Sequence, residues 1–367
     1  MKRKYRKIIR KKNIHKRYKR KKYIPKKNSL FPKLIKLLVI ILLIIILINK
    51  INIISKVHIA VNIDKQYIYT FIVYLTSLLD NKKASSFYTI HILTNNGTIY
   101  ECKDKINKVI ERFGTNSIKI KYYNLEGDFK GARVGAFPLA AYYRISLPST
   151  LYNLDKVIYT DVDMINLKDL SEMYNIKFKD KMYICAPLDF TFMISELKPF
   201  GINTNKYINA GIILFNLKEM RKNKIENKMR EFAITHKLNT YDQTVINAIC
   251  YNNTQILPFK YGLFAFDSID QLIKLNDKQD IMYRFNESEL IQAYNEPTLY
   301  HYFDGRKPWS KSYTKFNRVY WWYYSKMSGF FNEILDFYRF EKHYIEDLLN
   351  KIPEDGGILK RIYKKII

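Results

Sequence analysis

Residues 156–163 read KVIYTDVD, a short apolar strand pattern that runs directly into two aspartates, Asp161 and Asp163. In an extended segment residues i and i+2 point to the same side, so both carboxylates lie on one face beyond the end of the strand. Ligands bind at the carboxyl ends of strands in open α/β sheets. Two hard oxygen ligands there suit Mg²⁺ or Mn²⁺, which bridges to a diphosphate. An Asp-x-Asp pair taken alone is more often simply the start of a polar loop.

The segments around this strand alternate between strand and helix patterns. Strand patterns lie at 57–61, 88–93, 117–123, 156–160, 182–186 and 211–215. Helical patterns lie at 67–79, 98–112, 138–147, 218–236 and 242–251. This alternation predicts an α/β fold with a largely parallel sheet. We expect one catalytic domain over 57–310. A basic, aromatic C-terminal tail over 311–367 follows, which either packs on the domain or lies at a membrane interface.

The amino-terminal part carries much of the positive charge of this 367-residue chain. Residues 1–33 hold 17 of the 63 Lys and Arg and no acid. Residues 34–54 follow as a mainly apolar run, and 21 helical residues extend about 31 Å, roughly one hydrocarbon core. The bias of positive charge predicts a basic cytoplasmic tail over 1–33 and a transmembrane signal anchor over 34–54, with type II single-pass topology. A buried helix and a cleaved signal peptide are the alternatives, disfavoured by the missing polar face and cleavage site.

The composition excludes several classes of protein. A hydrophobic content of 47% excludes wholesale disorder. Three cysteines cannot form a disulfide scaffold, and without a Cys-x-x-Cys pair they do not indicate a zinc site. A basic arm beside an apolar run predicts attraction to anionic lipid, and we expect no nucleic-acid partner.

Ordered motifs between Val57 and Trp309 resemble glycosyltransferase family 8. Its members are retaining nucleotide-sugar transferases of GT-A fold, among them glycogenin-like enzymes and bacterial lipooligosaccharide galactosyl- and glucosyltransferases. The motifs read AYYRISLPSTLYNLDKVIYTDVDMINLKDL at 141–170, YINAGIILFNL at 207–217, YDQTVIN at 241–247 and HYFDGRKPW at 301–309. The resemblance implies a single Rossmann-like domain that binds a nucleotide sugar.

The resemblance also implies roles for individual residues. Asp161 and Asp163 bind a divalent metal with His301 as the third ligand, and Lys307 meets the diphosphate. Tyr67 stacks on uracil. The implied nucleotide-sugar site consists of Ala60, Asn62, Asp64, Tyr67, Arg144, Asp161, Val162, Asn209, Gly305 and Lys307. The chain departs from the family where Asp304 replaces the usual glycine and Gly305 follows one step later.

The residues implied in catalysis are Asp189, Asp242 and Gln243, which match positions lining the sugar pocket. Asp242 accepts hydrogen bonds from donor hydroxyls, or acts as a helix N-cap, or does both. Gln243 lies near the β face of the anomeric carbon. An amide is a poor nucleophile, so front-face substitution is favoured over double displacement.

Together these inferences predict a metal-dependent retaining hexosyltransferase. With Mn²⁺ or Mg²⁺ it moves glucose or galactose from a UDP-sugar to a hydroxyl of a glycan, glycolipid or glycoprotein. A eukaryotic source implies the Golgi membrane. The alternatives are a catalytically decayed, membrane-anchored carbohydrate-binding protein, a phosphotransferase of the same fold, and a nucleic-acid-binding membrane protein.

Overall fold

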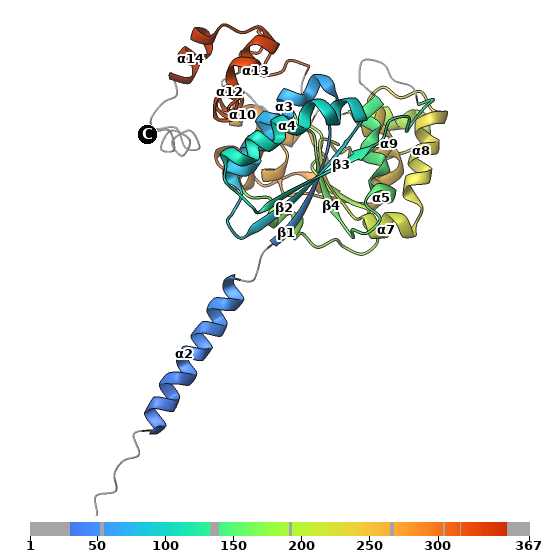
Figure 1. The fold of residues 1–367 in the computed structure, drawn as a ribbon. Helices are drawn as coiled ribbons and strands as arrows, with labels where there is room; N and C mark the ends of the chain where they lie inside the picture. The colour runs from blue at the N-terminus through green and yellow to red at the C-terminus, as the bar shows by residue number, and fades with distance from the viewer. Residues whose placement is uncertain are drawn as a thin grey trace, which may run out of the picture. The chain divides into compact units, whose positions relative to one another are not determined.

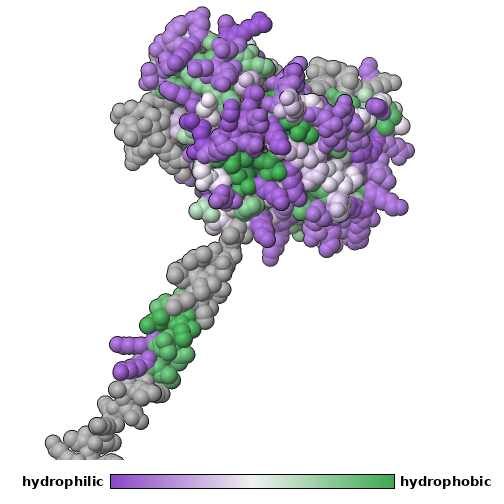
Figure 2. Space-filling view, viewed as in Figure 1, coloured by the Kyte–Doolittle hydropathy of each residue, from purple (hydrophilic) through white to green (hydrophobic). Residues whose placement is uncertain are grey.

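The computed structural model describes residues 30–51, 55–132, 139–190, 193–264, 268–303, 305–315 and 317–350. Helix α2, Leu30–Ile51, belongs to one unit, and the residues from Ser55 onward form a second, compact unit. The described side chains of α2, at 33–43, are exposed and mainly apolar (Figure 2). Within the described residues, no helix has both the length and the apolar character needed to cross a membrane. The predicted span over 34–54 is therefore not confirmed, and 52–54 and most of the basic tail lie outside the described residues.

A seven-stranded sheet forms the centre of the second unit, with strand order β3-β2-β1-β4-β7-β6-β8. Its strands are β1 Ser55–Asn62, β2 Ser86–Thr94, β3 Ile118–Asn124, β4 Val157–Thr160, β6 Ile184–Ala186, β7 Ile212–Phe215 and β8 Thr254–Ile256. Strand β7 runs antiparallel to both β4 and β6, so the sheet is mixed and the prediction of a largely parallel sheet holds only in part. A parallel pair needs a long crossover, usually helical. Between β6 and β7 the only described helical element is the 3-10 segment η3, Met193–Phe200.

Helices cover both faces of this sheet (Figure 1). One face packs against α3 Ile68–Asn81, α4 Asn96–Arg112 and α12 Arg318–Met327. The other packs against α5 Leu147–Thr150, α7 Leu217–Lys222, α8 Ile225–Thr235 and α9 Tyr241–Cys250. In α12, Trp321 and Trp322 are fully buried in the same core as strand β1. Part of the predicted tail over 311–367 therefore packs on the domain, while 351–367 lie outside the described residues.

The described chain contains further short elements. They are η1 Lys65–Tyr67, η2 Leu139–Ser146, α6 Ser171–Tyr174, η4 Tyr251–Asn253, η5 Phe259–Tyr261, α10 Ile269–Asp277, η6 Ile281–Tyr283, α11 Glu287–Asn295, α13 Phe331–Tyr338 and α14 Lys342–Asn350.

Two predicted helices differ from the structure for backbone reasons. The pattern at 218–236 forms two helices, because Lys224 adopts a left-handed conformation with φ of 53° between them. The pattern at 138–147 forms the 3-10 helix η2 and not an α-helix. Helical structure then continues through Pro148, which lies in the first turn of α5, where its missing N–H costs no hydrogen bond.

A second, three-stranded sheet places the predicted metal ligands. Its strands are β5 Met164–Asn166, β9 Leu263–Phe264 and β10 Leu299–His301, in the order β5-β10-β9. Strand β10 runs antiparallel to β5 and pairs His301 with Met164, the residue directly after Asp163. The backbone N–H of Tyr302 also donates to the carbonyl oxygen of Asp163 at 3.0 Å. The register of this small sheet thus brings together residues that are far apart in sequence.

Candidate active site

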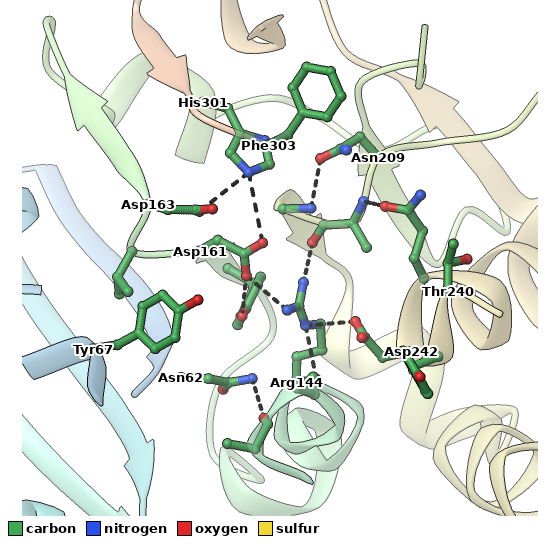
Figure 3. A pocket seen from close by; sticks show the side chains of 18 of the residues that line it. Asn62, Tyr67, Arg144, Asp161, Asp163, Asn209, Thr240, Asp242, His301 and Phe303 are labelled. Carbon is green, nitrogen blue, oxygen red and sulfur yellow. Dashed lines mark hydrogen bonds and ion pairs between the residues drawn. The ribbon is translucent and has the colours of Figure 1, made fainter. Parts of the chain in front are cut away.

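A cavity of about 410 Å³ lies beyond the carboxyl ends of β1 and β4 (Figure 3). All the predicted site residues line it except two. Ala60 is fully buried within β1 and packs in the core between the sheet and the helices. Gly305 is exposed, and a Cβ added there meets no atom within 4 Å. The structure therefore brings neither Ala60 nor Gly305 to the cavity.

Asp161, Asp163 and His301 converge at one side of this cavity (Figure 3). Nε2 of His301 lies 3.4 Å from Oδ1 of Asp163 and 4.0 Å from Oδ2 of Asp161. Two ligand atoms that each lie about 2.1 Å from one ion are at most about 4.2 Å apart. The observed separations therefore match those of ligands to a single ion.

The chemistry of these three residues also fits a divalent cation. Oδ1 of Asp163 is buried, and Nε2 of His301 lies 3.4 Å from it, which is too long for a well-formed hydrogen bond. A buried anionic oxygen with only this distant contact is costly unless a cation binds it. Two carboxylates and one imidazole are a ligand set that Mn²⁺ or Mg²⁺ accepts. Asp161, Asp163 and His301 thus form a candidate metal site in the described part of the chain.

Lys307 holds the second carboxylate oxygen of Asp163. Its Nζ lies 2.7 Å from Oδ2 of Asp163 and donates to the carbonyl oxygen of Tyr302 at 2.5 Å. Burial by itself raises the pKa of Asp163, but the Lys307 ammonium and the His301 imidazole outweigh burial and hold that pKa below its ordinary range. Asp163 is therefore ionised, with one oxygen on Lys307 and the other directed toward His301.

Arg144 joins the metal side of the cavity to its opposite wall (Figure 3). This buried side chain, carried by η2, lies 2.8 Å from Asp161 through Nη2 and 3.0 Å from Asp242 through Nε. Its Nη1 donates to the carbonyl oxygen of Ala210 at 2.6 Å, and its guanidinium lies 4.2 Å from the Tyr159 ring centroid. Burial alone lowers the pKa of Arg144, but the two aspartates raise it above its ordinary value. Arg144 therefore stays charged and fixes both carboxylates.

Burial disfavours the charged form of Asp242. Burial raises its pKa to about 6, because Arg144 offsets the burial only in part and Asp161 adds repulsion. Helix α9 begins one residue earlier, at Tyr241, so Asp242 lies in the first turn and not at the N-cap position. Its carboxylate instead pairs with Arg144 and faces the cavity.

Gln243 has both polar atoms of its amide engaged. Its Oε1 accepts from the Ala210 backbone N–H at 2.9 Å, and its Nε2 donates to Oδ2 of Asp189 at 2.9 Å. Asn209 donates to the same Asp189 oxygen at 3.4 Å. An amide held in this way has a fixed orientation and little nucleophilic character. Asp189, Asn209 and Gln243 therefore form a rigid polar wall.

Tyr67 lies at the end of the cavity that is opposite this polar wall (Figure 3). Oδ1 of Asp64 accepts from the backbone N–H groups of Gln66 and Tyr67 at 2.9 and 3.2 Å, which caps the turn η1. Burial, followed by the charges of Asp163 and Asp64, raises the pKa of Tyr67 to about 12. Asn62 donates to the carbonyl oxygen of Ala140 at 2.9 Å. The Tyr67 ring is thus a neutral aromatic wall held by a capped turn.

Sequence reasoning missed two residues of this site. Gly211 lies beneath the imidazole of His301, and a Cβ added to it would lie 2.3 Å from Cε1 of that ring. The glycine in the quoted YINAGIILFNL segment was the available signal. Tyr241 has a φ of 45°, an uncommon conformation for a large side chain, directly before Asp242. No sequence pattern marks such a position.

Comparison with known proteins gives consistent matches over the same region. The family described as glycosyl transferase family 8 matches residues 58–312. General stress protein A of Bacillus subtilis (strain 168) is 27% identical over 201 residues, which cover 49% of this chain and 67% of that protein. Lipopolysaccharide 1,2-glucosyltransferase of Escherichia coli is 26% identical over 264 residues, which cover 69% of this chain and 73% of that protein.

Solved structures share the fold at low sequence identity. The galactosyltransferase LgtC in complex with donor and acceptor sugar analogs superposes with a TM-score of 0.59 at 19% identity, covering 74% of this chain and 95% of that one. The bifunctional glycosyltransferase WbbM, in its apo structure, superposes with a TM-score of 0.63 at 18% identity. That match covers 77% of this chain and 51% of WbbM, so the chain spans about half the length of that protein. The second unit therefore has the GT-A fold with a mixed central sheet.

Proposed function

The chain belongs to glycosyltransferase family 8, and we propose that it transfers a hexose from a UDP-sugar to a hydroxyl group with retention of the anomeric configuration. The hexose is glucose or galactose, and the acceptor is a glycan, glycolipid or glycoprotein. The observation that carries this proposal is the convergence of Asp161, Asp163 and His301 on one cavity with Lys307 beside them.

The order of side chains along the cavity supports a nucleoside diphosphate sugar as the ligand. Tyr67 offers an aromatic surface for a base at one end. The two metal-site aspartates and Lys307 offer a place for two phosphates, because a cation and an ammonium both bind phosphate oxygens. The polar wall of Asp189 and Gln243 then faces the sugar, whose hydroxyls need fixed hydrogen-bond partners.

A divalent cation at Asp161, Asp163 and His301 would offset charge that develops on the departing diphosphate. Lys307 adds a second positive charge at the same place, since its ammonium is already within 2.7 Å of Asp163. Arg144 keeps Asp161 in place on the metal side and Asp242 on the sugar side. Positive charge thus gathers where negative charge builds up during transfer.

The fixed amide of Gln243 supports front-face substitution. Its Nε2 and Oε1 are bound to Asp189 and Ala210, so attack by this side chain would first break both hydrogen bonds. In the front-face route the acceptor hydroxyl passes its proton to the leaving diphosphate oxygen while the bond to the anomeric carbon forms on the same side. Asp242 and Asp189 accept hydrogen bonds from donor hydroxyls and orient the sugar.

The names of relatives support a hexose as the transferred group. The E. coli relative is a glucosyltransferase that acts on lipopolysaccharide, and LgtC is a galactosyltransferase.

We also propose a type II membrane protein, in the Golgi membrane if the source is eukaryotic, with 1–33 cytoplasmic and 34–54 as the anchor. The sequence alone supports that topology.

The test is transfer and hydrolysis of UDP-glucose and UDP-galactose by the full chain with Mn²⁺, beside the variant Asp163→Asn. We expect one donor to be turned over with retention, seen by NMR of the product anomer, and the variant to lose at least about a hundredfold in kcat. Equal rates for the two proteins would favour the decayed carbohydrate-binding protein. Release of sugar 1-phosphate would favour the phosphotransferase.

A further inference from the structure

The C-terminal helices α12 and α13 contact two segments that adjoin the proposed donor site. Strand β10 leads into the segment with Lys307, Pro308 and Trp309, which we call the Lys307 loop and define as residues 305–310. Helix α3 follows Tyr67 directly. Lys307 and Tyr67 both line the cavity, but they lie 240 residues apart in sequence. Whatever sets their separation also sets the length of ligand that the cavity accepts.

Aromatic side chains of α12 and α13 contact the Lys307 loop. The indole Nε1 of Trp322 donates to the carbonyl oxygen of Pro308 at 3.1 Å. The ring of Trp309 lies 5.1 Å from Trp321 and 5.6 Å from Tyr338, measured between centroids. Since Trp309 is two residues after Lys307, these contacts fix the backbone from which the lysine extends.

Helix α13 also reaches the start of α3. The hydroxyl of Tyr338 forms a 2.8 Å hydrogen bond with Oγ1 of Thr70, in the first turn of α3. The neighbouring Phe337 packs against Tyr69 at 5.1 Å between ring centroids. Burial raises the pKa of Tyr338 above its ordinary value, although the hydrogen bond with Thr70 opposes this shift. Tyr338 therefore touches the loop of Lys307 on one side and the helix that follows Tyr67 on the other.

We propose that Tyr338 is a positioning residue that sets the spacing between Tyr67 and Lys307, so that the cavity matches the length of a nucleoside diphosphate. This inference rests on the proposed function. Tyr338 does not line the cavity and touches no substrate there. It acts by joining the Lys307 loop to α3, the helix that begins directly after Tyr67. A ligand whose two parts are bound at once gains affinity only when the spacing of the two subsites fits it.

The experiment compares UDP with its two parts. Affinities for UDP, UMP and inorganic pyrophosphate, each with Mn²⁺, are measured for the full chain and for Tyr338→Phe, which keeps the ring and removes the hydroxyl. The hydrogen bond already exists in the ligand-free protein, so its energy of about 1 kcal/mol is the upper limit of the loss in binding, and we expect the affinity for UDP to fall about two- to fivefold. We expect the affinities for UMP and pyrophosphate to change by less than about twofold, because neither ligand spans both subsites.

The chain offers a built-in optical readout and matched variants. Its only three tryptophans are Trp309, Trp321 and Trp322, so selectively excited tryptophan fluorescence reports this aromatic cluster alone. Thr70→Val removes the same hydrogen bond from the other side and should reproduce the effect of Tyr338→Phe, without adding to it in the double variant. Thr70→Ser keeps the hydroxyl and should behave as wild type.

The control is Tyr323→Phe in α12, because the buried Tyr323 hydroxyl has no hydrogen-bond partner among the described residues. Its UDP affinity should be unchanged. Unchanged UDP affinity in Tyr338→Phe would overturn the inference, as would an equal loss for all three ligands, which a merely structural role predicts. A wild-type chain that binds no UDP with Mn²⁺ would overturn the proposed function together with this inference.

Discussion

The pair His58 and His91 makes the fold sensitive to acid, and the size of the effect follows from its geometry. His91 is buried in β2, its Nε2 lies 3.0 Å from Nδ1 of His58, and its Nδ1 lies 3.0 Å from the Tyr123 hydroxyl. Burial, followed by the charges of His58 and Lys121, lowers the pKa of His91 to about 3. Burial, followed by Lys121 and Lys56, also lowers the pKa of His58.

The unfolded chain takes up a proton at His91 near pH 6.5, while the folded chain does not until about pH 3. The unfolded state therefore binds more protons over this range, and stability falls as the pH drops below 6.5. At pH 5, about 1.5 pH units below the unfolded pKa, the loss is about 2 kcal/mol at 1.36 kcal/mol per unit. The lowered pKa of His58 adds a loss of the same sign.

The assay is the free energy of unfolding from denaturant titrations at pH 7.5 and pH 5, for the wild type and for His91→Gln. The amide keeps a hydrogen-bonding group toward His58 and does not titrate in this range. We expect the variant to be less stable at pH 7.5 by about 1 kcal/mol, because it loses the bond to Tyr123. Its loss on acidification should be smaller than that of the wild type by about 2 kcal/mol. An equal loss in the two proteins would refute the reasoning.

Two further predictions concern the metal side of the cavity. Lys307→Met should bind Mn²⁺ alone more tightly than the wild type, because both oxygens of Asp163 become available. The same variant should bind UDP with Mn²⁺ at least about tenfold more weakly, because it lacks the ammonium that binds the diphosphate. Isothermal titration with and without UDP measures both affinities, and weaker binding of Mn²⁺ alone would contradict the prediction. Gly211→Ala should lower Mn²⁺ affinity by at least about tenfold, since the new methyl group displaces the His301 ring. The matched control is Gly305→Ala, whose Cβ would enter open space, and it should bind Mn²⁺ as the wild type does. An equal loss of Mn²⁺ affinity in the two variants would contradict the close approach of His301 to Gly211.

The strands were predictable from sequence because each is a short run of apolar and β-branched residues bounded by polar turns. The orientation of β7 was not, because direction depends on the path of the connection and not on residue type. The interruption at Lys224 was equally hidden, since a lysine in a left-handed conformation leaves no pattern.

The site was predictable as far as motifs mark it. The resemblance located Asp161, Asp163 and His301 on the chain, but their separations depend on the pairing of β10 with β5. Ala60 illustrates the limit of the resemblance, because its side chain points into the core. Tyr338 lies outside every motif, and its contacts with Thr70 and Trp309 arise only from helix packing.

The central claim is that Asp161, Asp163 and His301 hold a divalent cation against a nucleoside diphosphate. Electron paramagnetic resonance of Mn²⁺ titrated into the full chain with UDP tests it most directly, with His301→Ala and Asp163→Asn beside the wild type. We predict one tightly bound Mn²⁺ per chain in the wild type and at least about tenfold weaker binding in each variant. Wild-type Mn²⁺ affinity in either variant would contradict the claim.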